Sequence, residues 1–477
     1  MSVISNVKSK LTGEVDLLSP NVKRNILLFA IPVAFSGLLQ IFYNLADQLV
    51  CAMYGSVYSY PAITATSVIT SLVVNLMSGF SVGANVSISN ALGSKDEEKG
   101  KRVIGSSYIL VIICSIVLTT LACLLSRNML EWLQTTPNTI DLANQYLLVY
   151  FLGLPFTILY NISAALLRGM GDSKRPFYIL AIAGLINVCL NFLFVLGFKM
   201  DVVGVGLATV ISQGFASIVT FIVLIRYKGF ANLHVKYLRF YKREISEILK
   251  TGIPASIQST LFSIPNMMNQ SFINQRGDAF VAGSGAAFQL ESFLNTSQNC
   301  FSQACIAFVA ANYGAKNISN IKKSIIWCQV FAMITAIVVG AIMIIFRVPL
   351  LNLFLSKQKE AGEDIYNQAM EAGSLRMIVD FTPYIFFTVV DCAPSALRGL
   401  KHSTLTMIIS LIGICGIRII FLQFIYPLPY FNTPFWLYAV FPISWIITAI
   451  AQLTTLIITY KKMFKNEIDN SKLANQN

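Results

Sequence analysis

Two hexapeptides far apart in the chain share a pattern of polar residues within apolar stretches. Residues 43–48 read YNLADQ and residues 265–270 read PNMMNQ, so an Asn and a Gln recur at the same spacing. The first copy places Asp47 where the second has Asn269, and no Lys or Arg lies three or four residues from Asp47. A carboxyl group withdrawn from water can exchange a proton near neutral pH, whereas an amide cannot.

Further polar residues stand in other apolar stretches. Asn187 and Asn191 are one helical turn apart and therefore share a face, and Thr209 lies in the stretch LATVIS that follows. Ionisable side chains are costly inside a membrane, which makes them candidate functional groups. Candidates in the later apolar stretches are Glu291, Asp380, Asp391 and Arg418.

Structural roles would also explain these residues. Asp47 could cap a helix or line a hydrated vestibule near the membrane surface, and the two asparagines could simply bond helix to helix. Glu291 and Asp391 could attract a cationic substrate, or one of them could pair with Arg418. The residues alone leave these alternatives open.

Helices that cross a membrane must position these side chains. The chain has 477 residues, of which 55% are hydrophobic and 12% charged, and its mean hydropathy is +0.67. A soluble domain carries roughly twice that charged fraction, and a membrane-spanning helix needs about 20 mostly apolar residues. We therefore predict an all-α integral membrane protein with twelve transmembrane helices. The predicted spans are 22–50, 60–92, 101–125, 139–167, 177–198, 203–226, 245–274, 281–313, 320–346, 367–397, 402–426 and 433–461.

The basic residues orient these helices. Of the 35 Lys and Arg residues, 27 fall in the N-terminal segment, the even-numbered connections or the C-terminal segment, and 8 fall elsewhere. Basic residues gather on the cytoplasmic side of membrane proteins, so we expect both termini in the cytoplasm and no nucleic-acid partner. The basic connection 226–250 could lie along anionic lipid headgroups or form a solvated linker.

Several kinds of chemistry find no support in the residues. Nine cysteines without a CxxC pair are expected to be packing residues. His234 and His402 are the only histidines, and both fall in predicted connections. No nucleotide-binding loop is found. We therefore expect no enzymatic activity, no bound metal and no cofactor.

The hexapeptides belong to a duplicated six-helix unit. Residues 91–101 (ALGSKDEEKGK) match 312–322 (NYGAKNISNIK), and 161–173 (NISAALLRGMGDS) match 391–403 (DCAPSALRGLKHS). Because each unit has an even number of spans, the two lobes should be related by a pseudo-twofold axis along the membrane normal. The predicted organisation is a cytoplasmic lead-in (1–21), an N-terminal lobe (22–226), a basic cytoplasmic linker (227–244), a C-terminal lobe (245–462) and a cytoplasmic tail (463–477).

Four motifs stand in order along the chain: IPVAFSGLLQIFYNLADQLVCAMYG (31–55), Gly-x-Lys after spans two and eight, Leu-Arg-Gly after spans four and ten, and GVGLATVIS (204–212). Together they resemble the multidrug and toxic compound extrusion (MATE) family, in its bacterial DinF-like and MepA-like branch. The resemblance implies a secondary antiporter of the cytoplasmic membrane, working by alternating access of two lobes. It would export small lipophilic or cationic drugs in exchange for inward H⁺ or Na⁺, as a monomer surrounded by membrane lipids.

The resemblance also implies which residues couple ion flow to export. In this branch an aspartate on span one binds the coupling cation, together with an Asn and an Asp one turn apart on span five and a Thr on span six. Asp47, Asn187 and Thr209 match this pattern, whereas Asn191 stands in place of the second carboxylate. Because a proton needs only one carboxylate, we favour H⁺ as the coupling ion, with Na⁺ as the alternative.

Methionine, aromatic and polar residues near these positions are the candidate substrate contacts. Methionine and aromatic surfaces suit promiscuous binding of flat lipophilic cations, although such residues also pack against lipid and neighbouring helices. The candidates are Gln48, Asn161, Met267, Met268, Asn269, Glu291, Asp391 and Arg418.

Other protein classes fit less well. A lipid-linked oligosaccharide flippase of related architecture, the main alternative, typically has fourteen spans. A major facilitator carries Asp-Arg-x-Gly-Arg after its second span, where this chain has GSKDEEKGKR. A membrane enzyme would need a constellation of His, Cys or Ser that the chain does not offer.

Overall fold

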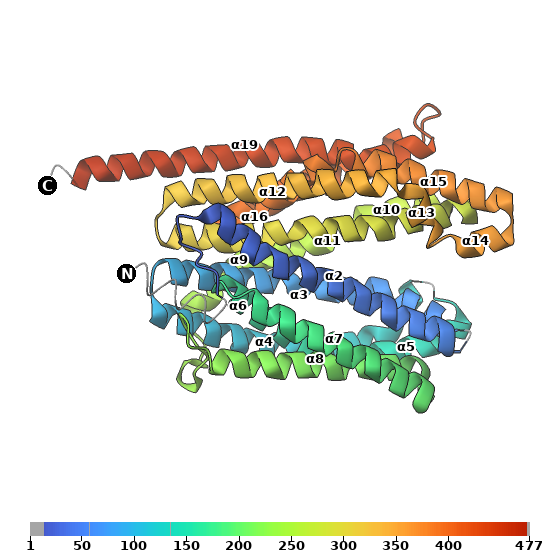
Figure 1. Ribbon diagram of the computed structural model, residues 1–477, viewed down its shortest axis with the longest axis horizontal. Coiled ribbons are helices and arrows are strands. Elements are labelled where there is room, and N and C mark those ends of the chain that lie inside the picture. The colour runs from blue at the N-terminus through green and yellow to red at the C-terminus, as the bar shows by residue number, and fades with distance from the viewer. Residues whose placement is uncertain (1–13, 57, 134, 475–477) are drawn as a thin grey trace. The chain divides into compact units, whose positions relative to one another are not determined.

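The structure, a computed structural model, describes residues 14–56, 58–133 and 135–474, apart from the side chains of residues 60, 357, 361 and 464–474. Every regular element in these ranges is helical (Figure 1). Helices satisfy their own backbone hydrogen bonds, which lipid cannot do, so they are the expected way for such a chain to cross a membrane.

The helices group into two compact units. The N-terminal unit contains Leu27–Ser256 and the residues up to Ser19, and the C-terminal unit contains Pro20–Ile26 and Ile257–Asn477. The predicted linker, residues 227–244, therefore belongs to the N-terminal unit.

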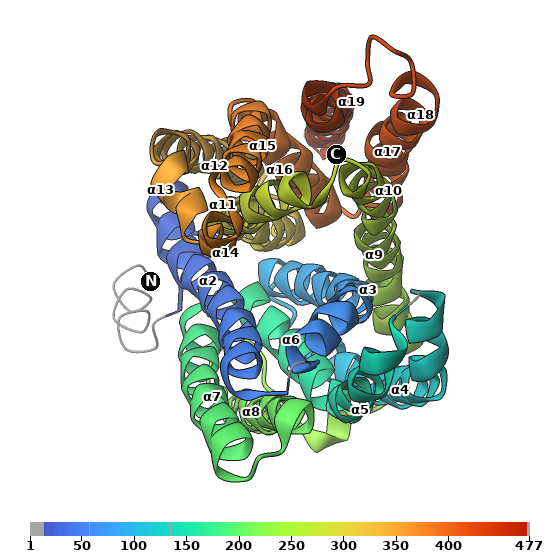
Figure 2. The ribbon, with the colours of Figure 1, turned by 90° about the vertical axis from the view of Figure 1, so that its right-hand side faces the viewer.

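The N-terminal unit is a bundle in which α3 packs against α4, α5 and α6, and α8 packs against α5, α6 and α7. Figure 2 shows these helices nearly end-on. Its helices are α2 (Val22–Tyr54), α3 (Ser59–Gly93), α4 (Glu97–Trp132), α5 (Pro137–Leu152), α6 (Leu154–Gly169), α7 (Lys174–Phe192), which a π-helical turn extends to Gly197, and α8 (Asp201–Ile225).

In the C-terminal unit, α11 packs against α12, α15 and α16, and α19 packs against α15 and α16. Its helices are α9 (Lys242–Leu261), which begins in the N-terminal unit, α10 (Ser263–Asn274), α11 (Asp278–Gly314), α12 (Ile318–Ile345), α13 (Arg347–Asn352), α14 (Ser356–Ala361), α15 (Glu363–Phe381), α16 (Tyr384–Gly399), α17 (Ser403–Ser410), α18 (Ile417–Ile420) and α19 (Pro434–Ala474). π-helical turns, Leu411–Gly416 and Phe421–Ile425, join α17 and α18 into one span.

All twelve predicted spans fall on helices. Among the described residues, eight helices are long and apolar enough to cross a membrane, or ten if two bent pairs each form one span. The other two predicted spans, 245–274 and 281–313, coincide with α9 plus α10 and with α11. Numerous Ser, Gln, Asn and Thr side chains lower the hydropathy of these two spans.

Prolines accompany the breaks in these spans. α5 and α6 meet at 48° and α15 and α16 at 52°, with Pro155 in the first turn of α6 and Pro383 directly before α16. Pro265 lies in the first turn of α10, after the break that follows α9. Proline lacks the N–H group that would continue a helix and clashes with the preceding turn. Other prolines lie inside uninterrupted helices, among them Pro32, Pro254 and Pro394.

Two glycines allow the first part of α9 to lie directly against α3. A Cβ atom on Gly79 would lie 2.3 Å from Ser256 N, and one on Gly83 would lie 2.3 Å from Ile248 O. Ser256 Oγ donates to Leu76 O at 2.6 Å in the same contact. Backbone approach of this kind is open only to glycine, so these residues anchor α9 to the N-terminal unit.

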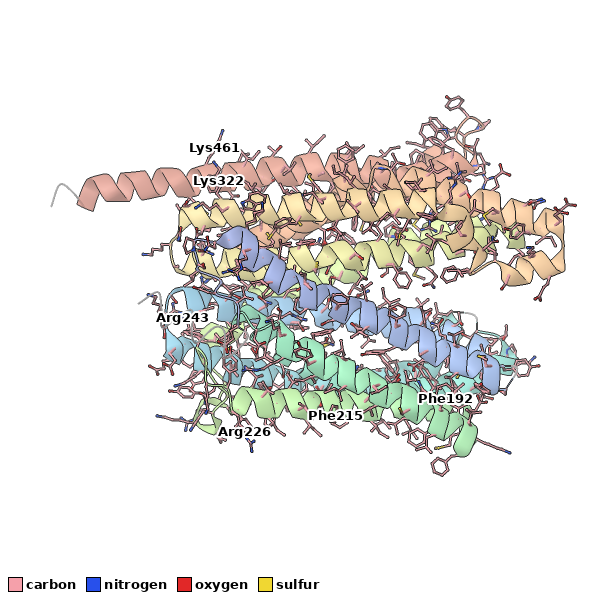
Figure 3. The ribbon with its side chains drawn as sticks, viewed as in Figure 1. Phe192, Phe215, Arg226, Arg243, Lys322 and Lys461 are labelled. Carbon is pink, nitrogen blue, oxygen red and sulfur yellow. The ribbon has the colours of Figure 1, made fainter. Side chains whose placement is uncertain are left out.

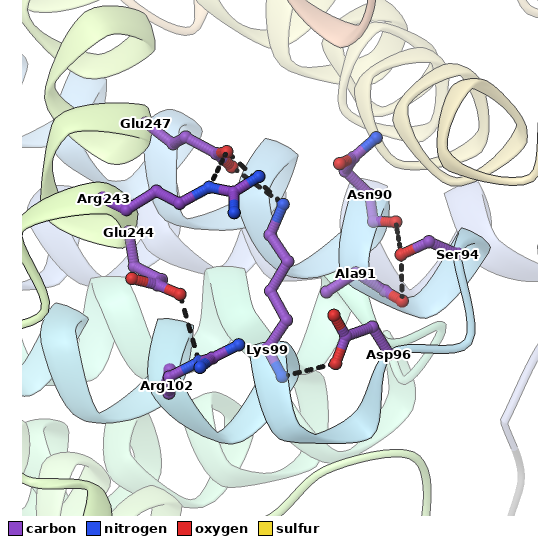
Figure 4. Close-up of polar contacts among 9 residues, drawn as sticks. All are labelled: Asn90, Ala91, Ser94, Asp96, Lys99, Arg102, Arg243, Glu244 and Glu247. Atoms are coloured by element: carbon purple, nitrogen blue, oxygen red, sulfur yellow. Dashed lines mark hydrogen bonds and ion pairs between the residues drawn. The ribbon is translucent and has the colours of Figure 1, made fainter.

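Ion pairs secure the same contact at the start of α9 (Figure 4). Lys99 Nζ lies 3.1 Å from Glu247 Oε2, and Arg102 Nε lies 3.1 Å from Glu244 Oε1. Arg243 Nε adds a longer contact of 3.9 Å with Glu247. The Glu244 side chain is only 6% exposed, so its charge depends on Arg102 far more than a solvated carboxylate would.

We expect Glu244→Ala to lower the thermal unfolding midpoint of the detergent-purified protein, because it leaves Arg102 without its partly buried partner. The destabilisation should be about 1–2 kcal/mol, between the values typical of surface and buried pairs. The matched control is Glu97→Ala, since Glu97 is 61% exposed and pairs with Lys101 on the same helix. Equal midpoints for the two variants would contradict this role of Glu244.

Candidate functional site

The N-terminal unit brings together the four residues predicted to couple ion flow. Asn191 Nδ2 on α7 donates to Asp47 Oδ1 on α2 at 2.6 Å, and Thr209 Oγ1 on α8 donates to Asp47 Oδ2 at 3.1 Å. Asn187 Nδ2 donates to Thr209 Oγ1 at 3.3 Å, and its Oδ1 accepts from Asn191 Nδ2 at 3.3 Å. Three helices thus contribute to one polar cluster.

A close contact between α2 and α7 sets the position of Asp47. Tyr43 lies one turn before Asp47, and its hydroxyl donates to Leu180 O at 2.6 Å. A Cβ atom on Gly184 would overlap the Tyr43 ring, at 1.7 Å from Cζ, so only glycine permits this packing. Neither Tyr43 nor Gly184 is among the residues predicted from the sequence. Tyr43 lies one helical turn before Asp47, and Gly184 lies about one turn before Asn187. These spacings could have indicated that the two residues lie beside the cluster.

The cluster is neutral apart from Asp47, which is 8% exposed and makes no ion pair in the part of the chain that the structure describes. Asn191 Oδ1 is buried and accepts no hydrogen bond there. An ionised carboxylate accepts from an amide N–H, whereas a protonated one donates to an amide oxygen. An asparagine that turns its amide can therefore serve both protonation states of Asp47.

The candidate substrate contacts are dispersed over both units. Gln48 and Asn161 are half-buried in the N-terminal unit, and Met268 is half-buried on α10. Met267 is 49% exposed. Asn269, the counterpart of Asp47, is buried, and its Oδ1 accepts no hydrogen bond among the described residues.

Glu291 belongs to a buried ionic cluster in the C-terminal unit. Arg376 Nη2 on α15 donates to Glu291 Oε2 on α11 at 3.2 Å, and Arg376 Nε lies 3.4 Å from Asp380 Oδ2. The partner of Glu291 is therefore Arg376, which is not among the predicted residues, and not Arg418. Arg376 lies four residues before Asp380, and residues at this spacing meet on one helix face, so the sequence could have indicated this ion pair.

Arg418 makes neutral contacts instead. Its Nη1 donates to Asn266 Oδ1 at 3.1 Å and its Nε donates to Ser444 Oγ at 2.9 Å. The guanidinium also stacks over Phe441, at 4.3 Å from the ring centroid. Arg418 therefore joins α10, α18 and α19.

Asp391 makes no ion pair with the cluster and is held by neutral donors on α11. Its Oδ2 accepts from Gln298 Nε2 at 3.2 Å, Asn299 Nδ2 at 3.0 Å and Ser302 Oγ at 2.7 Å.

No group of three or more His, Cys, Asp or Glu side chains that could hold a metal ion occurs among the described residues.

Known proteins are similar to this sequence along much of its length. The MatE family model matches residues 32–193 and 254–423. The probable multidrug resistance protein YoeA of Bacillus subtilis (strain 168) is 28% identical over 418 residues, which are 84% of this chain and 86% of YoeA. The multidrug export protein MepA of Staphylococcus aureus (strain MRSA252) is 28% identical over 286 residues, 60% of this chain and 63% of MepA. The match to MepA thus spans less than two thirds of that relative.

Solved structures share the fold. A MATE protein crystallised in complex with MaL6 superposes with a TM-score of 0.86 at 19% identity, covering 95% of this chain and 99% of that one. The predicted fold class, an all-α membrane protein with twelve helices in two six-helix lobes, is confirmed. Because the family model matches most of both lobes, this chain belongs to the multidrug and toxic compound extrusion (MatE) family of efflux transporters, as its motifs predicted.

Proposed function

We propose that this chain is a secondary antiporter that exports lipophilic or cationic compounds across the cytoplasmic membrane in exchange for inward H⁺. Asp47 is the observation that carries the proposal. It is a buried carboxyl group that two amides and one hydroxyl surround, and no Lys or Arg of the described residues forms an ion pair with it. A buried ion pair would favour the charged state alone, whereas neutral donors that can also accept allow both states.

The names of the relatives support the export of drugs, since YoeA and MepA are named for multidrug resistance and multidrug export. In this proposal, the lobes 22–226 and 245–462 alternate between inward-open and outward-open states. Protonation of Asp47 from outside and its release inside would bias that exchange, because a ligand shifts an equilibrium only through its different affinities for the two states. Half-buried Gln48 and Met268 are the substrate contacts we would examine first.

We expect Asp47→Asn to reduce ethidium efflux at least tenfold while leaving expression and the size-exclusion profile unchanged. The amide preserves the shape of the side chain but cannot gain or lose a proton. The matched control is Asp141→Asn, because Asp141 is 71% exposed and pairs with Arg127 at 3.2 Å. Wild-type efflux in Asp47→Asn cells would remove Asp47 from the mechanism.

The driving force available from protons is sufficient for export. Moving one elementary charge inward is worth about 2.3 kcal/mol per 100 mV, and a tenfold concentration ratio costs about 1.4 kcal/mol. One proton per neutral substrate therefore sustains on the order of fifty-fold accumulation from the potential alone. Sodium is the alternative, because oxygens of Asp47, Asn187, Asn191 and Thr209 could together surround a small cation.

We expect an imposed proton gradient to drive ethidium transport into proteoliposomes, and a sodium gradient at equal pH to drive none. Asn191→Asp is an informative comparison, since it supplies the second carboxylate and should make transport more dependent on sodium by offsetting the desolvation of that ion. If wild-type transport persists without a proton gradient and stops when only the sodium gradient is removed, the proton assignment is wrong.

We further propose that both termini face the cytoplasm. In the N-terminal unit, Arg226 and Arg243 lie at the end of the bundle away from Phe192 (Figure 3), as the enrichment of basic residues on the cytoplasmic side requires.

Val235→Cys, placed in the 80% exposed connection before α9 on a cysteine-free background, should react with an impermeant maleimide only after the cells are permeabilised. Tyr430→Cys, which replaces a 75% exposed residue between the last two spans, should react in intact cells and serves as the matched control. Labelling of residue 235 in intact cells would overturn the orientation.

A further inference from the structure

A groove opens at one end of the C-terminal unit, between the start of α17 and residues 455–463 of α19. It encloses about 490 Å³, within the range of roughly 300–1,000 Å³ typical of small-molecule sites. It lies at the end of the unit where Lys322 and Lys461 are found in Figure 3. The residues that define its chemistry are His402 and Leu405 from α17 and its cap, and Thr455, Ile458, Thr459 and Lys462 from α19.

The lining changes from cationic to apolar along the groove. Lys462 on α19 and His402 at the start of α17 lie at the outer end, while Ile458 and Leu405 each lie one turn further into the bundle. The four α19 residues recur at helical spacing, so they share one face and extend over about 10 Å. A basic outer end thus adjoins an inner part lined by Leu405 and Ile458, with Thr455 beside them.

The start of α17 adds to the attraction for an anion. The helix continues through π-helical turns as far as Ile425, so the dipoles of its first N–H groups point towards the groove end that His402 forms. The His402 side chain makes no capping hydrogen bond to α17. Both features reinforce the charge of Lys462, with Lys401 and Lys461 adjacent in the sequence.

The groove is continuous with the lipid-facing surface of its helices. Leu405 is 41% exposed, Ile408 45% and Ile458 54%, and all three lie within membrane spans. An acyl chain can therefore enter the apolar part of the groove from the bilayer, and the basic side chain of Lys462 at the outer end favours a negatively charged group.

We propose that this groove is a binding site for an anionic phospholipid of the adjacent leaflet. Lys462 and His402 hold the phosphate, and the Thr459 hydroxyl donates to it. One acyl chain lies along Leu405 and Ile458. Lysine side chains at a membrane surface each favour anionic lipid by about 1 kcal/mol. Burial of an acyl chain against Leu405 and Ile458 adds a hydrophobic contribution to the binding free energy, which a free anion lacks.

A lipid bound in this groove would connect α17 and α19 in addition to the hydrogen bonds that already join these helices. Gln452 Nε2 on α19 donates to Thr406 O at 3.1 Å and to Ser410 Oγ at 3.0 Å on α17. A lipid held between α17 and α19 at the outer end extends this connection, so it stabilises the folded state in proportion to its occupancy. The inference does not depend on which ion drives export or on Asp47.

The full chain, purified in detergent, would be titrated with phosphatidylglycerol, phosphatidylcholine or inorganic phosphate. The readouts are the thermal unfolding midpoint and the number of lipids retained in native mass spectra. We expect phosphatidylglycerol to raise the midpoint saturably with one lipid retained, phosphatidylcholine to act more weakly, and phosphate to have no effect. Lys462→Gln should raise the half-saturating phosphatidylglycerol concentration about fivefold, and Leu405→Gln should raise it as well.

Lys461→Gln is the matched control, because Lys461 is the neighbour of Lys462 and lies outside the groove lining. It should change the half-saturating concentration less than twofold. Equal effects of the two lysine variants would overturn the proposal in favour of diffuse surface charge, and an equal response to inorganic phosphate would overturn it in favour of a free-anion site. If Lys462→Gln fails to fold, His402→Gln carries the same test, with Lys462→Arg expected to bind as the wild type does.

Discussion

A carboxyl group inside a membrane bundle must obtain its hydrogen bonds from neighbouring helices, because lipid offers none. Asp47 meets this requirement with neutral donors from α7 and α8. Donors within hydrogen-bond distance require close helix contact, which the Tyr43 ring against Gly184 provides between α2 and α7. The packing of three helices therefore follows from the need to surround one carboxyl group without neutralising it.

The C-terminal unit meets the same requirement in two ways. Asp391 accepts hydrogen bonds from neutral donors on α11, whereas Glu291 and Asp380 pair with an arginine. Arg376 contacts both Glu291 and Asp380, so each ion in this cluster depends on the others. Removing one partner from a buried pair costs about 3–5 kcal/mol, because the remaining charge stays buried alone. Asn269, in the position equivalent to Asp47, has no proton to exchange. The C-terminal unit thus contains a buried ionic cluster, whereas the Asp47 cluster of the N-terminal unit consists of one carboxyl group and neutral partners.

Ten of the twelve spans could be predicted because the sequence contains apolar runs of membrane length. The other two, 245–274 and 281–313, contain many polar residues. The cluster around Asp47 could also be predicted, since asparagines four residues apart share a helix face and the family resemblance supplied the partner helices. The pairing of Glu291 with Arg376 could not, because the two residues lie on α11 and α15 and their approach depends on helix packing. For the same reason the sequence could not show that Arg418 contacts Asn266. The end of the N-terminal unit inside α9 likewise depends on ion pairs with α4 that composition does not reveal.

The two units have kept equivalent helix bends, whereas their buried ionisable residues differ. α5 and α6 bend by 48° beside Pro155, and α15 and α16 bend by 52° beside Pro383. A bend frees backbone groups that an apolar environment penalises, so neighbouring helices must satisfy them and the arrangement is costly to change after duplication. A single side chain such as Asp47 or Asn269 can be exchanged without refolding its helix. Divergence between the units can therefore proceed through individual buried side chains on a common backbone, while both units keep their bends.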